Sequence, residues 1–245
     1  MTMPRWSTLL LVLCISVGFA VLCGLGTWQL QRLAWKEALI ERVNAGLSAD
    51  PVSVDDIAAM EESGEDIEYR PAFASGRFDH SREQHYFATH KGRSGYFVYT
   101  PLIREDNSAL FVNRGFVPMH LKDAENRSVG QIEGVVRIEG LARSAPHEKP
   151  NSFVPNNDLG KNVYYWKSLA QMSGRAFDKM ETSIVPVFLD ANDKANPGGW
   201  PLGGVTRITF PNSHLQYAIT WFGLALALLG VGGFFLRSRR RPSAY

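Results

Sequence analysis

The amino-acid sequence predicts an α+β membrane protein in which two transmembrane helices flank a mainly antiparallel β domain. Two apolar runs lie near the ends of the 245-residue chain, and neither Trp6–Gln31 nor Ile208–Leu236 contains a charged residue. Each run exceeds the roughly 20 residues that a helix needs to cross a bilayer. All 24 Asp and Glu residues lie between positions 31 and 216, where short segments alternate apolar and polar side chains as half-buried strands do.

Charges around the apolar runs predict the topology. We expect a cytoplasmic tail at 237–245, because its four arginines favour the cytoplasmic side of a membrane. Arg32, Lys36 and Arg42 follow the first run and favour the opposite orientation more weakly. The expected order is a cytoplasmic N-terminus at 1–7, a transmembrane helix at 8–31, an exported domain at 32–213, a transmembrane helix at 214–236 and the tail.

The first apolar run leaves one alternative open, a cleaved signal peptide. It is long for one and lacks a clean cleavage site, which favours a permanent helix. Cys14 and Cys23 both lie in this run, so the exported domain has no disulfide. The N-terminus also lacks an Arg- and Ser-rich presequence. These features favour a multi-pass protein of a bacterial inner membrane, with its main domain in the periplasm.

Residue patterns predict the elements of the exported domain in order. A helical period carries the first helix past the membrane to near Gly46, and Ser53 starts a short helix that ends near Gly64. A hairpin turn is expected at 104–108, a loop at 144–163, a helix at Lys167–Lys179 and a second loop at 196–204. The expected strands are Tyr69–Phe78, Gln84–Thr89, Tyr96–Ile103, Ala109–Phe116, Gln131–Ala142, Ile184–Asp190 and Val205–Phe210.

The central domain shows no catalytic or nucleic-acid-binding pattern, so we expect a protein that is not an enzyme. Residues 31–216 have a net charge of −3, from 21 Lys and Arg against 24 Asp and Glu, which is unlike a nucleic-acid-binding domain. Gly92-Arg-Ser-Gly95 is not a nucleophile elbow, and the glycines of 198–204 lack the Lys-Ser/Thr of a phosphate loop.

Three histidines recur every five residues, at His80, His85 and His90. A five-residue step alternates the faces of a strand, so the three cannot converge from one regular strand. We therefore interpret them as solvated loop histidines rather than as a metal site.

The second apolar run begins with a histidine. Ser213 and Gln216 have the spacing of a capping box, which would make His214 the first residue of the helix. The positive end of the helix dipole disfavours imidazolium there and favours the neutral imidazole that binds metals. The simpler interpretation is an ordinary polar residue at the membrane interface.

Small residues predict how the two membrane helices pack. Ser16, Ala20 and Gly24 recur every fourth residue, as do Gly223 and Ala227, and such spacing lets helices approach closely. Packing would bring a group of polar and aromatic residues on the first helix near a similar group on the second. The simpler interpretation is that the aromatic residues only form an aromatic belt at the membrane interface. The residues are Trp28, Gln29 and Arg32 on the first helix, and His214, Gln216, Tyr217 and Trp221 on the second.

Four motifs give the sequence a resemblance to the surfeit locus protein one family. In chain order they are Gly26-Thr-Trp-Gln-Leu-Gln-Arg32 with Lys36, Gly95-Tyr-Phe-Val-Tyr-Thr-Pro-Leu102, Val112-Asn-Arg-Gly-Phe-Val-Pro118, and Asn212-Ser-His-Leu-Gln-Tyr-Ala218 with Thr220-Trp-Phe222. Phe116 departs from the tryptophan that is common in the third motif. The resemblance covers nearly the whole chain.

This resemblance implies an assembly factor for haem-copper terminal oxidases, especially cytochrome c oxidase. It implies haem a as a cofactor, with His214 as a ligand of the haem iron and Arg32, Trp28, Gln29, Tyr217 and Trp221 around the haem. Expected partners are the oxidase's catalytic subunit, haem a synthase and membrane lipid, but no nucleic acid. Asn113, Arg114 and Gly115 would bind a partner. The alternative is a haem-free membrane chaperone that docks an oxidase subunit.

Overall fold

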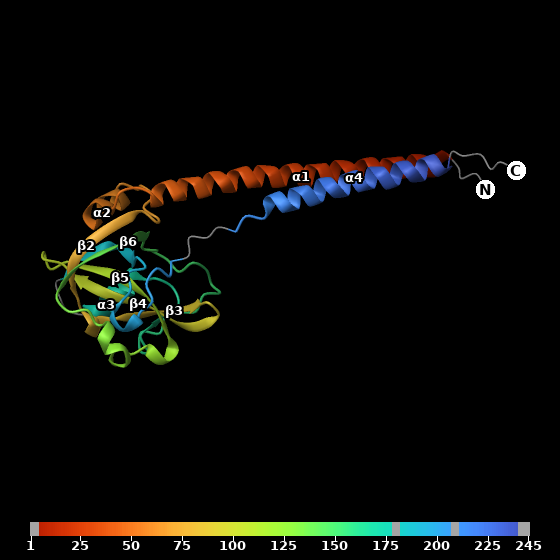
Figure 1. Ribbon diagram of the computed structural model, residues 1–245. Helices are drawn as coiled ribbons and strands as arrows, with labels where there is room; N and C mark the ends of the chain where they lie inside the picture. Colours follow the sequence, from red (N-terminus) through yellow and green to blue (C-terminus); the bar gives the residue numbers. More distant parts are fainter. Residues whose placement is uncertain (1–4, 178–181, 207–210, 240–245) are drawn as a thin grey trace. The chain divides into compact units, whose positions relative to one another are not determined.

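The computed structural model describes residues 5–177, 182–206 and 211–239. These residues fall into two compact units. One is a helical unit formed by residues up to Arg42 and from Thr209 onward, and the other is a β domain from Val43 to Ile208. Figure 1 labels helices α1 to α4 and strands β2 to β6 of these units.

The helical unit contains the two helices that the sequence predicts. Helix α1 runs from Arg5 to Leu47, past the end of the apolar run, and helix α4 runs from His214 to Arg239. Segments Trp6–Glu41 and His214–Ser238 are long and apolar enough to cross a membrane, with mean hydropathies of 2.6 and 2.0. Figure 1 shows the two helices side by side, and their contacts pair early residues of one with late residues of the other.

Glycines form the seam between these helices. A Cβ atom added at Gly26 would lie 2.7 Å from the ring of Phe222, and one at Gly18 would lie 3.1 Å from Leu228. On α4, Gly232 approaches Ile15 in the same way, with 2.7 Å from an added Cβ to Cδ1. Close approach at small residues is how apolar helices gain van der Waals contact when no water is expelled.

The predicted seam residues are wrong. Gly24 and Gly223 face open space, and Ser16, Ala20 and Ala227 are exposed. Gly24 and Gly26 are about 200° apart around the helix, so they lie on nearly opposite faces. Four-residue spacing of small residues therefore occurs on a face that does not pack, and the spacing does not distinguish the two faces.

The β domain is one eight-stranded sheet that curls into a barrel. The strand order is β1-β2-β6-β8-β5-β4-β3-β7, and a further pairing of β2 with β4 closes β2, β6, β8, β5 and β4 into a ring. Most pairings are antiparallel, while β1–β2, β3–β7 and β5–β8 are parallel. The strands are β1 (Val52–Ser53), β2 (Pro71–Phe78), β3 (Gln84–His90), β4 (Arg93–Ile103), β5 (Ala109–Pro118), β6 (Val135–Ser144), β7 (Val163–Tyr164) and β8 (Ile184–Ala191).

This architecture confirms six of the seven predicted strands within a few residues, together with the hairpin that joins β4 and β5. The seventh prediction, a strand at Val205–Phe210, is not supported at Val205 and Thr206, which have no strand structure, and its other residues lie outside the described ranges. The predicted helix at Lys167–Lys179 corresponds to the shorter α3, Leu169–Ala176, and part of the predicted range again lies outside the described residues.

Short helices cover the barrel core. Helix α2, Val54–Glu62, starts at a capping box formed by Ser53 and Asp56, and it buries Ile57 with Leu102, Leu110 and Leu189. Helix α3 buries Met172 in a second cluster that contains Phe111 and Phe188. In the described part of the domain there are also four 3₁₀ segments: η1 (His80–Arg82), η2 (Met119–Leu121), η3 (Ala124–Gly130), which is kinked at Arg127, and η4 (Pro197–Gly199).

A loop after η4 pairs closely with β5. Phe116 and Leu202 exchange two backbone hydrogen bonds of 2.9 Å each. Gly115 has a φ of +124°, and a Cβ atom added there would lie 1.8 Å from the carbonyl oxygen of Leu202. The position therefore requires glycine both for its backbone conformation and for the space that the loop occupies.

We expect Gly115→Ala to destabilise the β domain by more than about 3 kcal/mol, because strain at a glycine-specific conformation adds to a backbone clash. Gly134→Ala is the matched control. Gly134 has a φ of +82° but nothing within 4 Å of an added Cβ, so we expect a cost of only about 1 kcal/mol. Thermal unfolding of the purified variants measures both, and equal losses would contradict the steric argument.

Candidate functional site

The helical unit places a histidine and a glutamine in contact near the start of α4. His214 is the first residue of α4, as predicted, and its amide donates to Asn212 Oδ1 at 3.4 Å. Its Nδ1 lies 2.8 Å from Oε1 of Gln29, whose residue is only 9% exposed. The described contacts at this helix end involve Asn212, and the Ser213–Gln216 capping box is not among them.

This contact determines which nitrogen of His214 is available. An amide oxygen only accepts, so the imidazole donates its Nδ1–H to Gln29 and keeps the lone pair of a neutral ring on Nε2. Metal-binding histidines are commonly oriented in this way, with the second nitrogen held by a hydrogen-bond acceptor. The geometry therefore leaves Nε2 able to act as a metal ligand.

The other predicted site residues lie beside this pair. Trp28 and Tyr217 are 52% and 54% exposed, and Trp221 is half-buried. Arg32 is exposed, and its guanidinium carbon lies 4.5 Å from the centroid of the Trp35 ring. Trp28 and Gln29 are about 100° apart around an ideal helix, so they face different directions. The structure thus brings His214 and Gln29 together, and the other four residues lie within two turns of them along the same two helices.

Among residues 5–177, 182–206 and 211–239, no group of three or more His, Cys, Asp and Glu side chains is arranged to hold a metal ion. A bare metal ion needs several protein ligands, as in the four-coordinate zinc sites. His214 offers one imidazole. The site therefore fits a metal that already carries other ligands, such as iron in a porphyrin, better than a free ion.

The β domain contains a second polar cluster, which the sequence did not predict. Glu83, just before β3, is 5% exposed and lies between two buried arginines, Arg114 of β5 and Arg127 of η3. Arg127 donates to both carboxylate oxygens, at 3.2 Å for Nη1 and more closely for Nη2. Arg114 Nη1 lies 3.7 Å from Glu83 Oε1. Arg127 and Arg114 lie 44 and 31 positions after Glu83 in the chain. No local sequence pattern therefore predicts that they pair with it.

Hydrogen bonds and neighbouring positive charges lower the pKa of Glu83 more than burial raises it. Burial would raise the pKa of this carboxyl, but bonds from His80 and Arg127 and the charges of Arg127 and Arg114 lower it to about 2. A depressed pKa means that the folded state binds its proton less readily than the unfolded chain. The stabilisation is therefore present above about pH 4.5 and is lost as the pH falls towards 2.

The predicted partner-binding motif lies inside the domain. Asn113 and Arg114 are 4% and 2% exposed, and Gly115 is covered by the loop at Leu202. Asn113 donates to Asp190 Oδ1 at 2.9 Å, and Asp190 also accepts from Arg143 at 3.2 Å. Partner binding by this motif stays a prediction. Because the side chains are buried, any effect on a partner acts through the surface that they shape.

The predicted solvated loop histidines are wrong for two of the three positions. His85 is 6% exposed, and its Nδ1 lies 3.1 Å from the amide nitrogen of Asn162. His80 joins the Glu83 cluster, and its Nε2 lies 3.0 Å from the carbonyl oxygen of Ile132. His90 packs with its ring centroid 5.3 Å from that of Phe116. Polar partners distant in the sequence explain this burial.

A family model described as the SURF1 family matches residues 17–226. Surfeit locus protein 1 of Rattus norvegicus is 37% identical over 220 residues, which cover 83% of this chain and 68% of the relative. Surfeit locus protein 1 of Homo sapiens is 36% identical over 221 residues, with 83% and 70% covered. A SURF1-like protein of Drosophila melanogaster is 34% identical over 224 residues, again with 83% and 70% covered.

We expect Glu83→Gln to destabilise the β domain by about 3–5 kcal/mol, because it leaves two buried guanidiniums without their carboxylate. Glu139→Gln is the matched control, since Glu139 pairs with Arg137 on the surface and both side chains are about half exposed. Its cost should stay below about 1 kcal/mol. Chemical denaturation at pH 7 compares the two, and a Glu83 variant as stable as the control would contradict the role of this cluster.

Burial lowers the pKa of His85 to about 4, against 6.5 for a free histidine. Between these values the unfolded chain binds more protons, so stability falls as the pH drops from 6.5 to 4, by about 3 kcal/mol from this group. We expect His85→Asn to remove this part of the pH dependence, while His147→Asn, at an exposed loop position, leaves it intact. Unfolding curves from pH 7 to 4 provide the test, and an unchanged slope in the His85 variant would refute it.

Proposed function

Since this chain belongs to the SURF1 family, we propose that it is a membrane-bound assembly factor for a haem-copper terminal oxidase, cytochrome c oxidase in particular. The family match over residues 17–226 and the four motifs of the sequence support this proposal. We infer no catalytic activity, because the described polar clusters fit ion pairing and hydrogen bonding within the fold rather than a nucleophile with its base.

In this proposal α1 and α4 cross the membrane and the β domain lies on the non-cytoplasmic side. Their length and hydropathy support spanning, and the arginines that follow α4 support a cytoplasmic C-terminus. Exposed apolar side chains along both helices, such as Leu10, Leu226 and Phe234 at 64–76% exposure, suit contact with lipid. His214 and Gln29 then lie where α4 enters the outer leaflet.

The protein would hold haem a at this point and assist its delivery to the oxidase's catalytic subunit, with haem a synthase as a source. The observation that carries this part is the hydrogen bond between His214 Nδ1 and Gln29 Oε1, which leaves Nε2 to bind iron. His214 would hold the haem through Nε2, and the haem itself would be the cargo that the protein delivers.

Neighbouring residues have the chemistry to position such a ligand. Arg32 is exposed one turn of α1 beyond Gln29, where a guanidinium can pair with a propionate. Trp28, Tyr217 and Trp221 present aromatic surface at the same end of the helices, which suits a flat apolar macrocycle and the membrane interface. Gln29 is a positioning residue that acts through His214.

The test is to purify the full-length protein from cells that make haem a and to record its absorption spectrum. We expect a haem spectrum in the unaltered protein and its loss in both His214→Ala and His214→Leu. Gln29→Leu should weaken haem retention by about 10- to 100-fold, the usual effect of removing the group that orients a metal-binding histidine. Gln216→Leu, on an exposed glutamine two residues after His214, is the matched control and should retain haem.

Haem retained in full by both His214 variants would exclude this residue as the ligand. If the unaltered protein carries no haem yet is still required for oxidase activity, the haem-free chaperone that docks an oxidase subunit becomes the better account. If oxidase assembly proceeds normally without the protein, the assembly function itself is wrong.

A further inference from the structure

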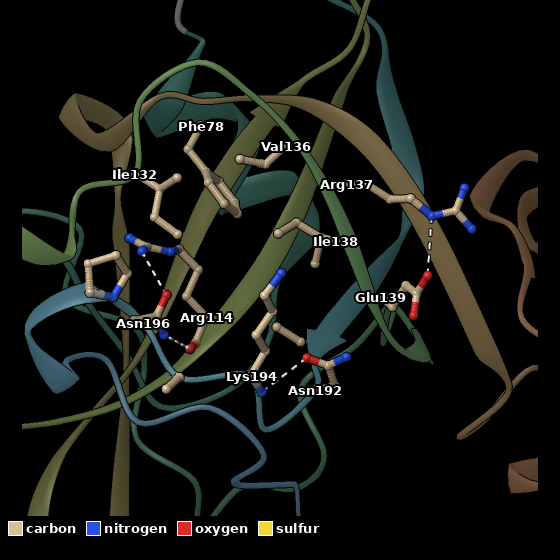
Figure 2. A pocket seen from close by; sticks show the side chains of 13 residues that line it. Phe78, Arg114, Ile132, Val136, Arg137, Ile138, Glu139, Asn192, Lys194 and Asn196 are labelled. Carbon is tan, nitrogen blue, oxygen red and sulfur yellow. Dashed lines mark hydrogen bonds and ion pairs between the residues drawn. The ribbon is translucent and has the colours of Figure 1, made fainter.

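A cavity of about 510 Å³ lies in the β domain, apart from the residues discussed as the haem site. Figure 2 shows its walls, which come from β6, from the end of β2 and from the segment between β8 and η4. This volume lies within the range of small-molecule sites in proteins, roughly 300–1,000 Å³. The cavity is therefore large enough for a specific ligand.

One side of the cavity is apolar. Phe78, Ile132, Val136 and Ile138 point towards its interior in Figure 2. Val136 and Ile138 belong to strand β6, whose Arg137 and Glu139 also line the cavity and pair with each other at 3.2 Å. This wall gains free energy when a ligand covers it, because apolar surface is removed from water.

A buried positive charge lies next to this apolar surface. Arg114 lines the cavity, and its guanidinium carbon lies 4.9 Å from the centroid of the Phe78 ring. Two of its nitrogens contact Gly130, Asn196 and His80, whereas its buried Nε has no hydrogen-bond partner in the part of the chain that the structure describes. An unpaired buried donor costs free energy that a suitable acceptor would recover.

The charges around Arg114 do not balance. Arg114 and Arg127 are both buried and share one described carboxylate, that of Glu83. The cluster therefore holds one positive charge in excess. In Figure 2 the side chain of Lys194 also extends towards the cavity, between Arg114 and Ile138, and Lys194 lines it. A buried excess charge favours an anion as the ligand.

We propose that this cavity binds a small apolar carboxylate, with the carboxylate at Arg114 and Lys194 and the apolar body against Phe78, Val136 and Ile138. A bare phosphate would neutralise the cations but leave the apolar wall in water, and a neutral apolar molecule would leave the charge uncompensated. The same chemistry occurs in a free acid and in the C-terminal residue of a peptide that ends in an apolar side chain.

Four probes, measured by ligand-observed NMR on the full-length protein in lipid nanodiscs, test the proposal and separate the two sources. They are 4-phenylbutanoate, its neutral amide, N-acetyl-glycyl-leucine with a free carboxylate, and the same peptide with an amidated end. We expect at least one acid to bind 10-fold or more tightly than its amide, since a charge-assisted hydrogen bond is lost. The acid that binds identifies the source, and the amides control for partition into lipid.

Two substitutions locate the binding. Lys194→Met should weaken the acid about 10-fold, and Lys194→Glu should weaken it further by placing a like charge at the mouth. Lys194 is exposed, so neither change disturbs the core. Lys91→Met, at an exposed turn between β3 and β4, is the matched control and should bind as the unaltered protein does. The proposal is overturned if neither acid binds, if acid and amide bind equally, or if the Lys194 variants match the control.

Discussion

The β domain depends on the carboxylate of Glu83, which neutralises charge between segments that are far apart in the sequence. It reaches Arg114 on β5 and Arg127 on η3, and His80 beside it contacts the backbone of Ile132 before β6. Removing these groups from water has a large free-energy cost, which their mutual contacts and their hydrogen bonds to Leu121, Gly130 and Asn196 offset. The cluster therefore stabilises one arrangement of these segments, because any other would leave buried charges unpaired.

The same cluster also fixes surface loops of the β domain against its core strands. Arg114 is held by Glu83 on one side and by Asn196 and the carbonyl of Gly130 on the other, so the loops near η3 and η4 are held against β5. Gly115, the next residue, has no side chain and lets the loop at Leu202 pair with β5. The Asn-Arg-Gly motif thus serves packing first. An effect of this motif on a partner would follow from the loops that it holds in place.

The sequence predicts correctly those features that depend on neighbouring residues. The end of α1 near Gly46, the cap of α2 at Ser53 and the hairpin between β4 and β5 each depend on neighbouring residues, and all three are confirmed. It also predicts that the group containing Gln29 lies near the group containing His214, and the contact between these two residues agrees with that expectation. It failed for the seam glycines, for the buried histidines and for the partners of Glu83. Those features depend on which faces meet in three dimensions, and spacing along the chain does not contain that information.

His214 offers a single protein ligand, and this suits the proposed role of holding a cofactor and releasing it. A site with three or four protein ligands would bind a metal ion strongly and keep it, as structural zinc sites do. A single histidine oriented by the neutral amide of Gln29 can complete the coordination of iron that a porphyrin already holds, and only one protein–metal bond then has to break for release. Trp28, Tyr217 and Arg32 are exposed, so their side chains are available to the proposed ligand. In the proposed role, a single protein–metal bond would favour release of the cofactor over its permanent retention.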